Sequence, residues 1–184
     1  SRRRAVLEDR AEREGHEDLP GHAHLPSWSE HLYVGNCRSA SATRFDTVIS
    51  TVTPRDAQGQ RDPSLSTHAL RFEDNLGRES REELALAKSR FVEGADLVAR
   101  SVSEGRKTLV HCAYGQNRSG SIVCAYAVLH LGWTARDAIG YMRERNRADR
   151  RYPHQNPMGN PAFCRVIEQL ERERRPAAAA AREP

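Results

Sequence analysis

Residues 110–120, which read V-H-C-A-Y-G-Q-N-R-S-G, constrain the fold of this 184-residue chain more than any other segment. They join an apolar run at residues 107–111 to a helical pattern that begins near Ser119. A loop that leads from the end of a strand into the start of a helix directs successive backbone N–H groups at one point, and the helix dipole adds positive charge there. The segment therefore predicts a strand, a loop and a helix around an anion of phosphate size.

Three residues of this loop have roles that their spacing explains. Cys112 lies at the floor of the loop, where the N–H groups that would bind phosphate also favour a thiolate. Six residues later, Arg118 comes round to the opposite rim, and its planar guanidinium can bind two phosphate oxygens at once. Gly115 allows the backbone to turn inward, where a β-carbon would collide. We expect Cys112 to be a nucleophile and Arg118 to bind the phosphoryl group.

The composition argues against several classes of protein. Lys and Arg number 29 against 25 Asp and Glu, and the net charge of +4 is too small to indicate an obligatory nucleic-acid partner. No apolar run approaches the roughly 20 residues that a membrane span needs, and the basic N-terminal segment lacks the apolar stretch of a secretory signal. The four cysteines have neither C-x-x-C nor disulfide-framework spacing. We expect free thiols and a cytoplasmic location.

Short apolar runs and helical patterns follow one another along the chain. We expect strands at residues 31–35, 47–52, 67–72 and 107–111, and helices at residues 39–45, 80–104, 119–131, 134–145 and 160–170. The longest helix is expected to start at a capping box of Ser80 and Glu83 and to end at Gly105. Continuously apolar strands combined with helices predict an α/β domain with a central mixed, mostly parallel sheet flanked by helices.

The two ends of the chain are predicted to lie outside this domain. Residues 1–18 alternate Arg with Glu and Asp around two apolar residues, which suits a short charged helix, and a Pro-, Gly- and His-rich linker follows to residue 26. We expect the folded domain over residues 27–175 and a disordered tail over residues 176–184. His22 and His24 have no third metal ligand nearby, and they are expected to be solvated linker residues.

The loop and three further segments carry a resemblance to a known family. The stretch H-C-A-Y-G-Q-N-R-S-G resembles the signature loop of the cysteine-dependent protein tyrosine phosphatases, in particular of their dual-specificity branch. Three segments are similar to that branch's opening strand and turn, its Ala-Tyr pair and the segment before its last helix: Leu32–Ala40, Ala125–Tyr126 and Asn160–Phe163. The resemblance covers Leu32 to Leu170. Together with the charged N-terminal segment, these motifs look most like the poxviral dual-specificity phosphatases.

The resemblance implies a small, protein tyrosine phosphatase-like fold of the dual-specificity type. It also implies hydrolysis of phosphotyrosine and phosphoserine or phosphothreonine monoesters through a phosphocysteine, without a metal or a cofactor. Such enzymes need a general acid, and we expect Asp74 in that role with Glu73 as its rival. Alternation from Leu70 and Phe72 leaves Asp74 on the loop beyond the strand.

The remaining site residues are expected around Cys112. Ser119 is expected to donate a hydrogen bond to the departing thiolate. His111 and Asn160 are expected to order the loop. The substrate-binding residues are the loop positions themselves, which are Ala113, Tyr114, Gly115, Gln116, Asn117 and Arg118.

Three other functions stay open on the sequence. RNA 5′-triphosphatases of the same superfamily also carry an Asn before the signature Arg, but they generally manage without the acid that Asp74 would supply. A phosphoinositide phosphatase is the second alternative, yet loop positions 113, 114, 116 and 117 hold no Lys or Arg. The third is a catalytically silent phosphate-binding adaptor, against which the intact Cys112 and Arg118 argue.

The resemblance also predicts partners. Phosphoproteins are the expected substrates, with phosphoinositides as a side activity. The poxviral enzymes exchange an N-terminal helix between two subunits, so we expect a homodimer that buries Val6 and Leu7, located in the host cytoplasm or the virion. Two features have alternative interpretations. The run Arg143–Arg151 is either a solvated helix end or an anion-binding rim, and Cys37 could form a disulfide with Cys112 on oxidation.

Overall fold

A mixed sheet underlies the fold in the computed structural model, which describes residues 21–39, 44–53, 68–149 and 156–180. Within these residues the strand order is β1-β2-β5-β3-β4. The strands are β1 (His22–His24), β2 (Leu32–Gly35), β3 (Thr47–Ser50), β4 (His68–Ala69) and β5 (Thr108–His111). Strands β2, β5, β3 and β4 run parallel to one another, and β1 pairs antiparallel with β2. The predicted mixed, mostly parallel sheet is confirmed.

The central strands β3 and β5 are buried along their whole length. Ile49 and Val110 face the main core beneath the helices. Val48 and Leu109 pack together on the other side, where Tyr33 and Phe45 cover them. Because both faces of these strands are covered, each has two consecutive apolar residues at its centre instead of an apolar residue at every second position.

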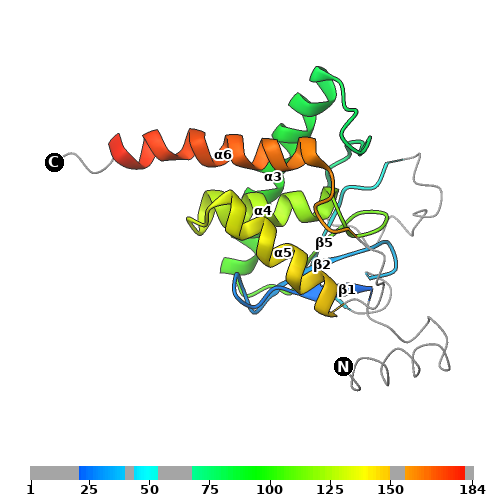
Figure 1. Ribbon diagram of the computed structural model, residues 1–184. Coiled ribbons are helices and arrows are strands. Elements are labelled where there is room, and N and C mark those ends of the chain that lie inside the picture. Colours follow the sequence, from blue (N-terminus) through cyan, green and yellow to red (C-terminus); the bar gives the residue numbers. More distant parts are fainter. Residues whose placement is uncertain (1–20, 40–43, 54–67, 150–155, 181–184) are drawn as a thin grey trace, which may run out of the picture.

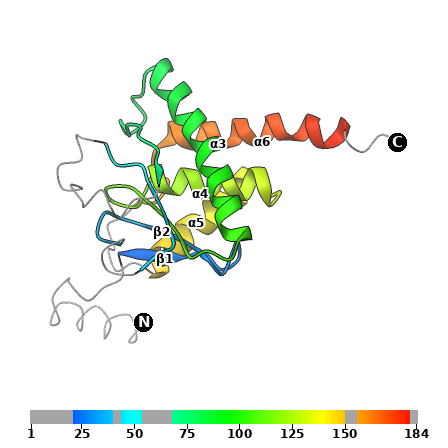
Figure 2. The same cartoon turned by 180° about the vertical axis from the view of Figure 1, so that it is seen from behind.

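Four described helices lie on one side of the sheet (Figures 1 and 2). They are α3 (Arg81–Ser103), α4 (Arg118–His130), α5 (Ala135–Asp149) and α6 (Pro161–Ala180). Helix α4 lies at their centre and is buried without interruption from Arg118 to Val128, which explains its lack of a polar face. The predicted capping box of Ser80 and Glu83 is confirmed at the start of α3.

The prediction of a linker over Leu19–Pro26 was wrong for its described part, because His22–His24 form strand β1. The strand is held from both directions. Its backbone pairs with Tyr33–Gly35, and Leu25 directly after it is completely buried. His24 stacks on Tyr33 with ring centroids 4.6 Å apart instead of projecting into solvent. The Pro- and Gly-rich composition predicted a linker, but the segment forms an edge strand that the buried Leu25 holds against the core.

Two further boundaries differ from the predictions. The strand expected over residues 67–72 is limited to His68–Ala69, and the chain then continues without strand pairing toward Asp74. The disordered tail expected from residue 176 is helical as far as Ala180. Alanine has the highest helix propensity, so an alanine run extends a helix that has already formed upstream.

Several predictions lie outside the described residues: the charged helix of residues 1–18 with Val6 and Leu7, the start of the linker, most of the short helix at 39–45, and residues 181–184. Among the described helices, none is long and apolar enough to cross a membrane.

Two glycines test how closely the helices pack. Gly94 of α3 faces α4, and a β-carbon there would lie 2.7 Å from Cγ2 of Ile122. Gly140 of α5 has open space around its α-carbon. We expect Gly94→Ala to lower the free energy of unfolding by about 1 to 2 kcal/mol, because overpacking outweighs the gain in helix propensity.

Gly140→Ala is the matched control, and it should raise the free energy of unfolding by about 0.5 to 1 kcal/mol through helix propensity alone. Urea unfolding of both variants measures these differences. Equal stabilisation by the two substitutions would contradict the close contact between α3 and α4.

Candidate active site

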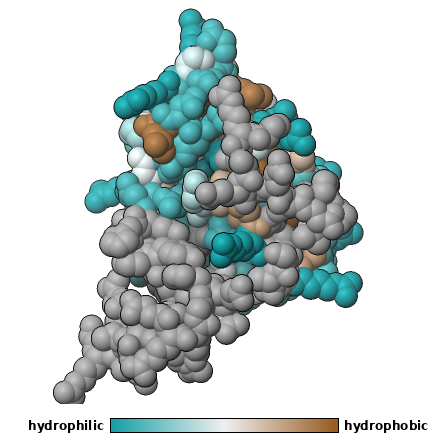
Figure 3. All heavy atoms as spheres, turned by 90° about the vertical axis from the view of Figure 1, so that its right-hand side faces the viewer, coloured by the Kyte–Doolittle hydropathy of each residue, from teal (hydrophilic) through white to brown (hydrophobic). Residues whose placement is uncertain are grey.

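The predicted loop occupies the edge of the sheet where the parallel strands end. Strands β2, β5 and β3 point in the same direction, so their carboxyl ends meet there. Cys112 follows β5 directly, and Arg118 is the first residue of α4. Figure 3 shows the molecule from this side, and its described surface is mostly hydrophilic with separate small apolar spots.

Two hydrogen-bonding groups contact the sulfur of Cys112. The Gly115 N–H donates to Sγ at 3.0 Å, and Ser119 Oγ lies 3.2 Å from it. Gly115 has φ = 70°, a conformation that a residue without a β-carbon adopts at little cost. Cys112 itself is only 3% exposed. The structure thus brings Ser119 to the sulfur and provides donors that can stabilise negative charge on it.

Arg118 is buried, and backbone carbonyls orient its guanidinium. Its Nη1 donates to the carbonyl of Thr51 at 3.4 Å and to that of Phe72 at 3.3 Å. The first carbonyl follows β3, and the second lies two residues before Asp74. The side chain therefore links the loop to the segment that carries the predicted acid.

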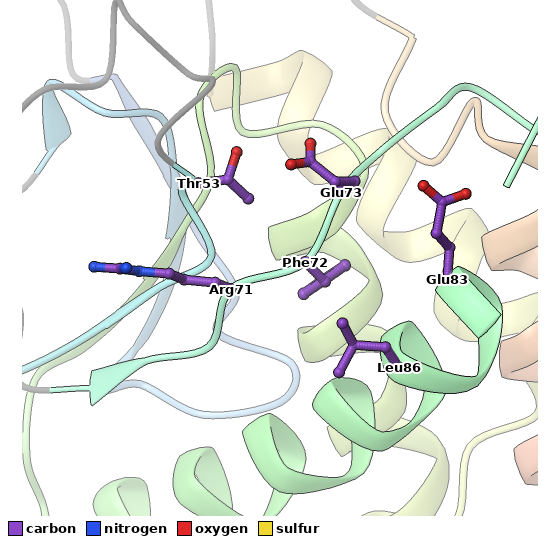
Figure 4. A pocket seen from close by; sticks show the side chains of 6 residues that line it. All are labelled: Thr53, Arg71, Phe72, Glu73, Glu83 and Leu86. Carbon is purple, nitrogen blue, oxygen red and sulfur yellow. The ribbon is translucent and has the colours of Figure 1, made fainter. Parts of the chain in front are cut away.

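Asp74 is held against the loop by side-chain amides. Asn117 Nδ2 donates to Oδ2 at 2.8 Å, and Asn160 Nδ2 donates to Oδ1 at 2.8 Å. The N–H of Leu76 also donates to Oδ1, at 3.0 Å. The neighbouring Glu73 instead lines a separate pocket (Figure 4). The structure therefore brings Asp74, and not Glu73, into contact with the loop.

Asn160 connects three parts of the site. Its Oδ1 accepts hydrogen bonds from the N–H groups of Ala162 and Phe163, so it caps the start of α6. Its N–H donates to Asn117 Oδ1 at 3.0 Å, while its Nδ2 reaches both Asp74 and Glu79. The predicted ordering role thus corresponds to a specific set of contacts. An Asn followed by Pro161 is the sequence signal of a helix start.

His111 lies beneath the loop, completely buried. Its Nδ1 is 3.4 Å from the carbonyl oxygen of Cys112. Its own carbonyl accepts hydrogen bonds from the N–H and the Oγ1 of Thr51, at 3.0 and 3.1 Å. His111 therefore ties the end of β5 to the end of β3, just before the loop begins.

Residues that the sequence analysis did not single out hold the loop from outside. Asn146 of α5 is buried and donates through Nδ2 to the carbonyl of Gly115 at 2.8 Å. The N–H of Met158 donates to the carbonyl of Gln116 at 3.1 Å. Both contacts join segments far apart in the chain, and no local pattern in the sequence indicates them.

Two arginines of the run Arg143–Arg151, Arg143 and Arg145, have side chains that the structure describes. Arg143 donates to the carbonyls of Pro157 and Met158, at 3.2 and 2.8 Å. Arg145 donates to the carbonyl of His24 at 3.2 Å. These two guanidinium groups hold backbone segments in place, and for the rest of the run both interpretations stay predictions. The side chain of Arg147, and Arg150 and Arg151 as a whole, lie outside what the structure describes.

All four cysteines are free thiols in the structure. Burial raises the pKa of Cys124, and burial also raises the pKa of Cys164. Both thiols therefore stay protonated at neutral pH. Cys37 contacts the loop, because its N–H and its Sγ both donate to the carbonyl of Ala113, at 3.3 and 3.2 Å. A disulfide between Cys37 and Cys112 on oxidation stays a prediction.

The loop residues expected to bind substrate differ in exposure. Tyr114 is the most exposed, at 63%, and it projects from the rim. Gly115, Asn117 and Arg118 are buried. The arrangement as a whole offers a nucleophilic sulfur, a buried guanidinium and a carboxyl group around one loop that opens a helix. That combination can attack, stabilise and protonate a phosphoryl ester.

Comparisons with known proteins agree with this chemistry. The family model described as "Dual specificity phosphatase, catalytic domain" matches residues 32–173. The chain is 34% identical over 74 residues to human Protein phosphatase Slingshot homolog 2, which covers 40% of this chain and 5% of that protein. It is 33% identical over 102 residues to Dual specificity protein phosphatase 26 of Rattus norvegicus, which covers 54% of this chain and 44% of that protein.

The fold is similar to that of solved phosphatase structures. Human DUSP28 superimposes with a TM-score of 0.61 at 19% identity, covering 84% of this chain and 94% of that one. At this identity the likeness concerns the fold. The chain spans less than half the length of the two curated relatives named above.

The loop geometry predicts that inorganic phosphate protects Cys112 from alkylation. Iodoacetate should modify Cys112 first, because the donors around its sulfur stabilise a thiolate and attract the anionic reagent. Millimolar phosphate should slow that reaction at least several-fold by occupying the loop. Peptide mass spectrometry over a time course measures the rates.

The other thiols serve as internal controls in the same experiment. Cys124 should stay unmodified in the folded protein, and alkylation of the half-buried Cys37 should not respond to phosphate. Equal protection of Cys37 and Cys112, or none for either, would contradict an anion site centred on Cys112.

Proposed function

This chain belongs to the family of dual-specificity phosphatase catalytic domains, and from that membership and its site we propose that it is a protein phosphatase. It hydrolyses phosphotyrosine and phosphoserine or phosphothreonine monoesters through a phosphocysteine. One observation carries the proposal. The Cys112 sulfur accepts a hydrogen bond from the Gly115 N–H and contacts Ser119, while Asn117 of the same loop holds Asp74.

In the first step the Cys112 thiolate attacks phosphorus, and the bond between phosphorus and the ester oxygen breaks. Asp74 donates its proton to that departing oxygen, so the alcohol or phenol leaves neutral. Arg118 and the backbone N–H groups of the loop stabilise the charge on the transferring phosphoryl group. The product of this step is a phosphocysteine at Cys112.

In the second step water attacks the phosphocysteine. Asp74, now a carboxylate, takes the proton from the water, and the phosphorus–sulfur bond breaks. The sulfur leaves as a thiolate, which Ser119 and the Gly115 N–H are placed to stabilise. Inorganic phosphate then dissociates. No step in this sequence requires a metal or a cofactor.

The described residues favour this function over the alternatives within the superfamily. An RNA 5′-triphosphatase would not need Asp74, whereas here two amide side chains bind both of its oxygens. A phosphoinositide phosphatase would gain from cations at the rim, but Arg143 and Arg145 bind backbone carbonyls. A silent adaptor would have no use for the contacts on the Cys112 sulfur.

Replacement of the nucleophile tests the proposal. Cys112→Ser should abolish turnover of phosphotyrosine and phosphothreonine peptides while phosphopeptide binding persists, because Arg118 and the loop amides remain. Initial rates on these two peptides, triphosphate-ended RNA and phosphoinositides, measured side by side, identify the preferred class.

The matched control is Cys164→Ser, in which the hydroxyl can replace the thiol as donor to the carbonyl of Met158. This variant should keep wild-type turnover. Turnover by Cys112→Ser within about tenfold of wild type, a loss of only about 1.4 kcal/mol, would contradict the role of the nucleophile.

A second substitution tests the general acid. Asp74→Asn should lower kcat by roughly 10² to 10⁴ on substrates with poor leaving groups and should remove the alkaline limb of the pH profile. Activated aryl phosphates with good leaving groups should lose much less, since their oxygen needs no proton. An equal loss in Glu73→Gln with none in Asp74→Asn would assign the role to Glu73.

We also propose that the chain forms a homodimer through its N-terminal segment and acts in the cytoplasm, as the likeness to poxviral enzymes predicts. Light scattering of the full-length chain at micromolar concentration should give a mass of about twice 20.7 kDa. Deletion of residues 1–18 should yield an active monomer. A full-length mass near 20.7 kDa would contradict the dimer.

A further inference from the structure

A second concave feature lies beside the segment that carries Asp74. It is a pocket of about 250 Å³, roughly eight times the ~30 Å³ that one water molecule occupies, so it has room for a side chain. The residues that line it come from the segment after β3, the segment before Asp74 and the first turns of α3; they are Thr53, Arg71, Phe72, Glu73, Glu83 and Leu86. No role in the reaction described above uses this pocket.

The pocket combines an apolar floor with an acidic mouth. Phe72 and Leu86 form the floor, and Leu86 is 44% exposed. Figure 4 shows Glu73 between Thr53 and Glu83 at one end of the pocket, with the hydroxyl of Thr53 on the side of Glu73. Arg71 extends from the opposite side of the pocket, away from both carboxylates. A ligand therefore meets apolar surface and two negative charges at this end.

The two carboxylates differ in their partners. Glu83 accepts hydrogen bonds from Asn75 Nδ2 at 2.8 Å and from the Ser80 N–H at 2.7 Å, which fix its position. No residue in the described part of the chain forms a hydrogen bond or an ion pair with Glu73, although its side chain is half-buried. Among the residues that the structure describes, no cation pairs with either carboxylate, and a cationic ligand would supply one.

The pocket adjoins the segment that carries Asp74. Glu73 and Asp74 are consecutive residues whose side chains point to different sites, Asp74 to the loop and Glu73 to the pocket. An extended peptide advances about 3.3 Å per residue. Because Asp74 contacts Asn117 of the loop while Glu73 lines the pocket, one residue of this segment separates the two, and a few residues of an extended peptide can span such a separation.

We propose that this pocket binds a Lys or Arg side chain near the phosphorylated residue of the substrate. The methylene groups of the stem pack on Phe72 and Leu86, and the charged head lies between Glu73 and Glu83. Long basic side chains combine an apolar stem with a cationic tip in this way. The inference rests on the proposed protein phosphatase function and adds a sequence preference to it.

The test is a series of phosphopeptides that carry one Lys at each position from −3 to +3 in a neutral background. At low salt, one position should raise kcat/KM about five- to tenfold over the peptide with Gln at that position. Norleucine at the same position should give a smaller increase, because it keeps the stem and lacks the charge. Moderate salt should reduce the Lys preference, as screening of an accessible ion pair requires.

Two variants separate the pocket from general electrostatics. Glu73→Gln should abolish the preference for Lys while leaving kcat/KM for the Gln peptide and for a small aryl phosphate unchanged. Glu82→Gln removes an exposed acid in the same first turn of α3 that does not line the pocket, and it should keep the preference.

A flat Lys series on peptides that are turned over would overturn the pocket and leave the proposed function intact. So would a preference that survives Glu73→Gln. Inactivity of the wild-type protein on every peptide and on the small aryl phosphate would instead overturn the proposed function, and the pocket with it.

Discussion

The loop between β5 and α4 can bind an anion only if its backbone N–H groups point inward, and this requirement leaves its carbonyl groups pointing outward. Buried carbonyls need donors. Four of them have one: Cys37 donates to Ala113, Asn146 to Gly115, Met158 to Gln116, and Ser121 to Asn117. These donors come from the segment after β2, from α5, from the chain before α6, and from α4 itself. The loop therefore keeps its shape because the surrounding elements each satisfy one carbonyl.

The position of Asp74 also depends on hydrogen bonds from residues that are distant in the chain. Asp74 has no regular secondary structure around it, so its place comes from the amides of Asn117 and Asn160. An aromatic cluster supports the segment before Asp74 and the first turn of α6. The ring centroids of Phe72 and Phe163 are 5.9 Å apart, and the ring centroid of Phe91 lies within 5.5 Å of each of them. Packing in the core thus holds the segment before Asp74 and the start of α6 together. A substitution in this cluster would act on both.

Charge in this protein is used in two ways. Arg143 and Arg145 satisfy backbone carbonyls, which gives these arginines a structural task in spite of their place in a highly charged run. Glu73 has no such task among the described residues, and its charge is available to a ligand. A run of charges in the sequence therefore does not reveal its role, because the role depends on which groups lie opposite each side chain.

The sequence by itself determined the α/β class, the capping box of α3 and the loop with Cys112 and Arg118, because each depends on residues close together in the chain. It was also sufficient to nominate Asp74 and Asn160 for the site. It did not determine strand β1. That strand forms because its backbone pairs with β2 and because Leu25, directly after it, is buried in the core. Only the tertiary structure placed Asp74 against the loop and Glu73 in the pocket, brought Asn146 and Met158 to the loop, and joined Glu73, Glu83 and Leu86 in one pocket. Some of these contacts join residues that are distant in the chain, and others depend on the directions in which two consecutive side chains point. The spacing of residues along the sequence indicates neither the long-range contacts nor those directions.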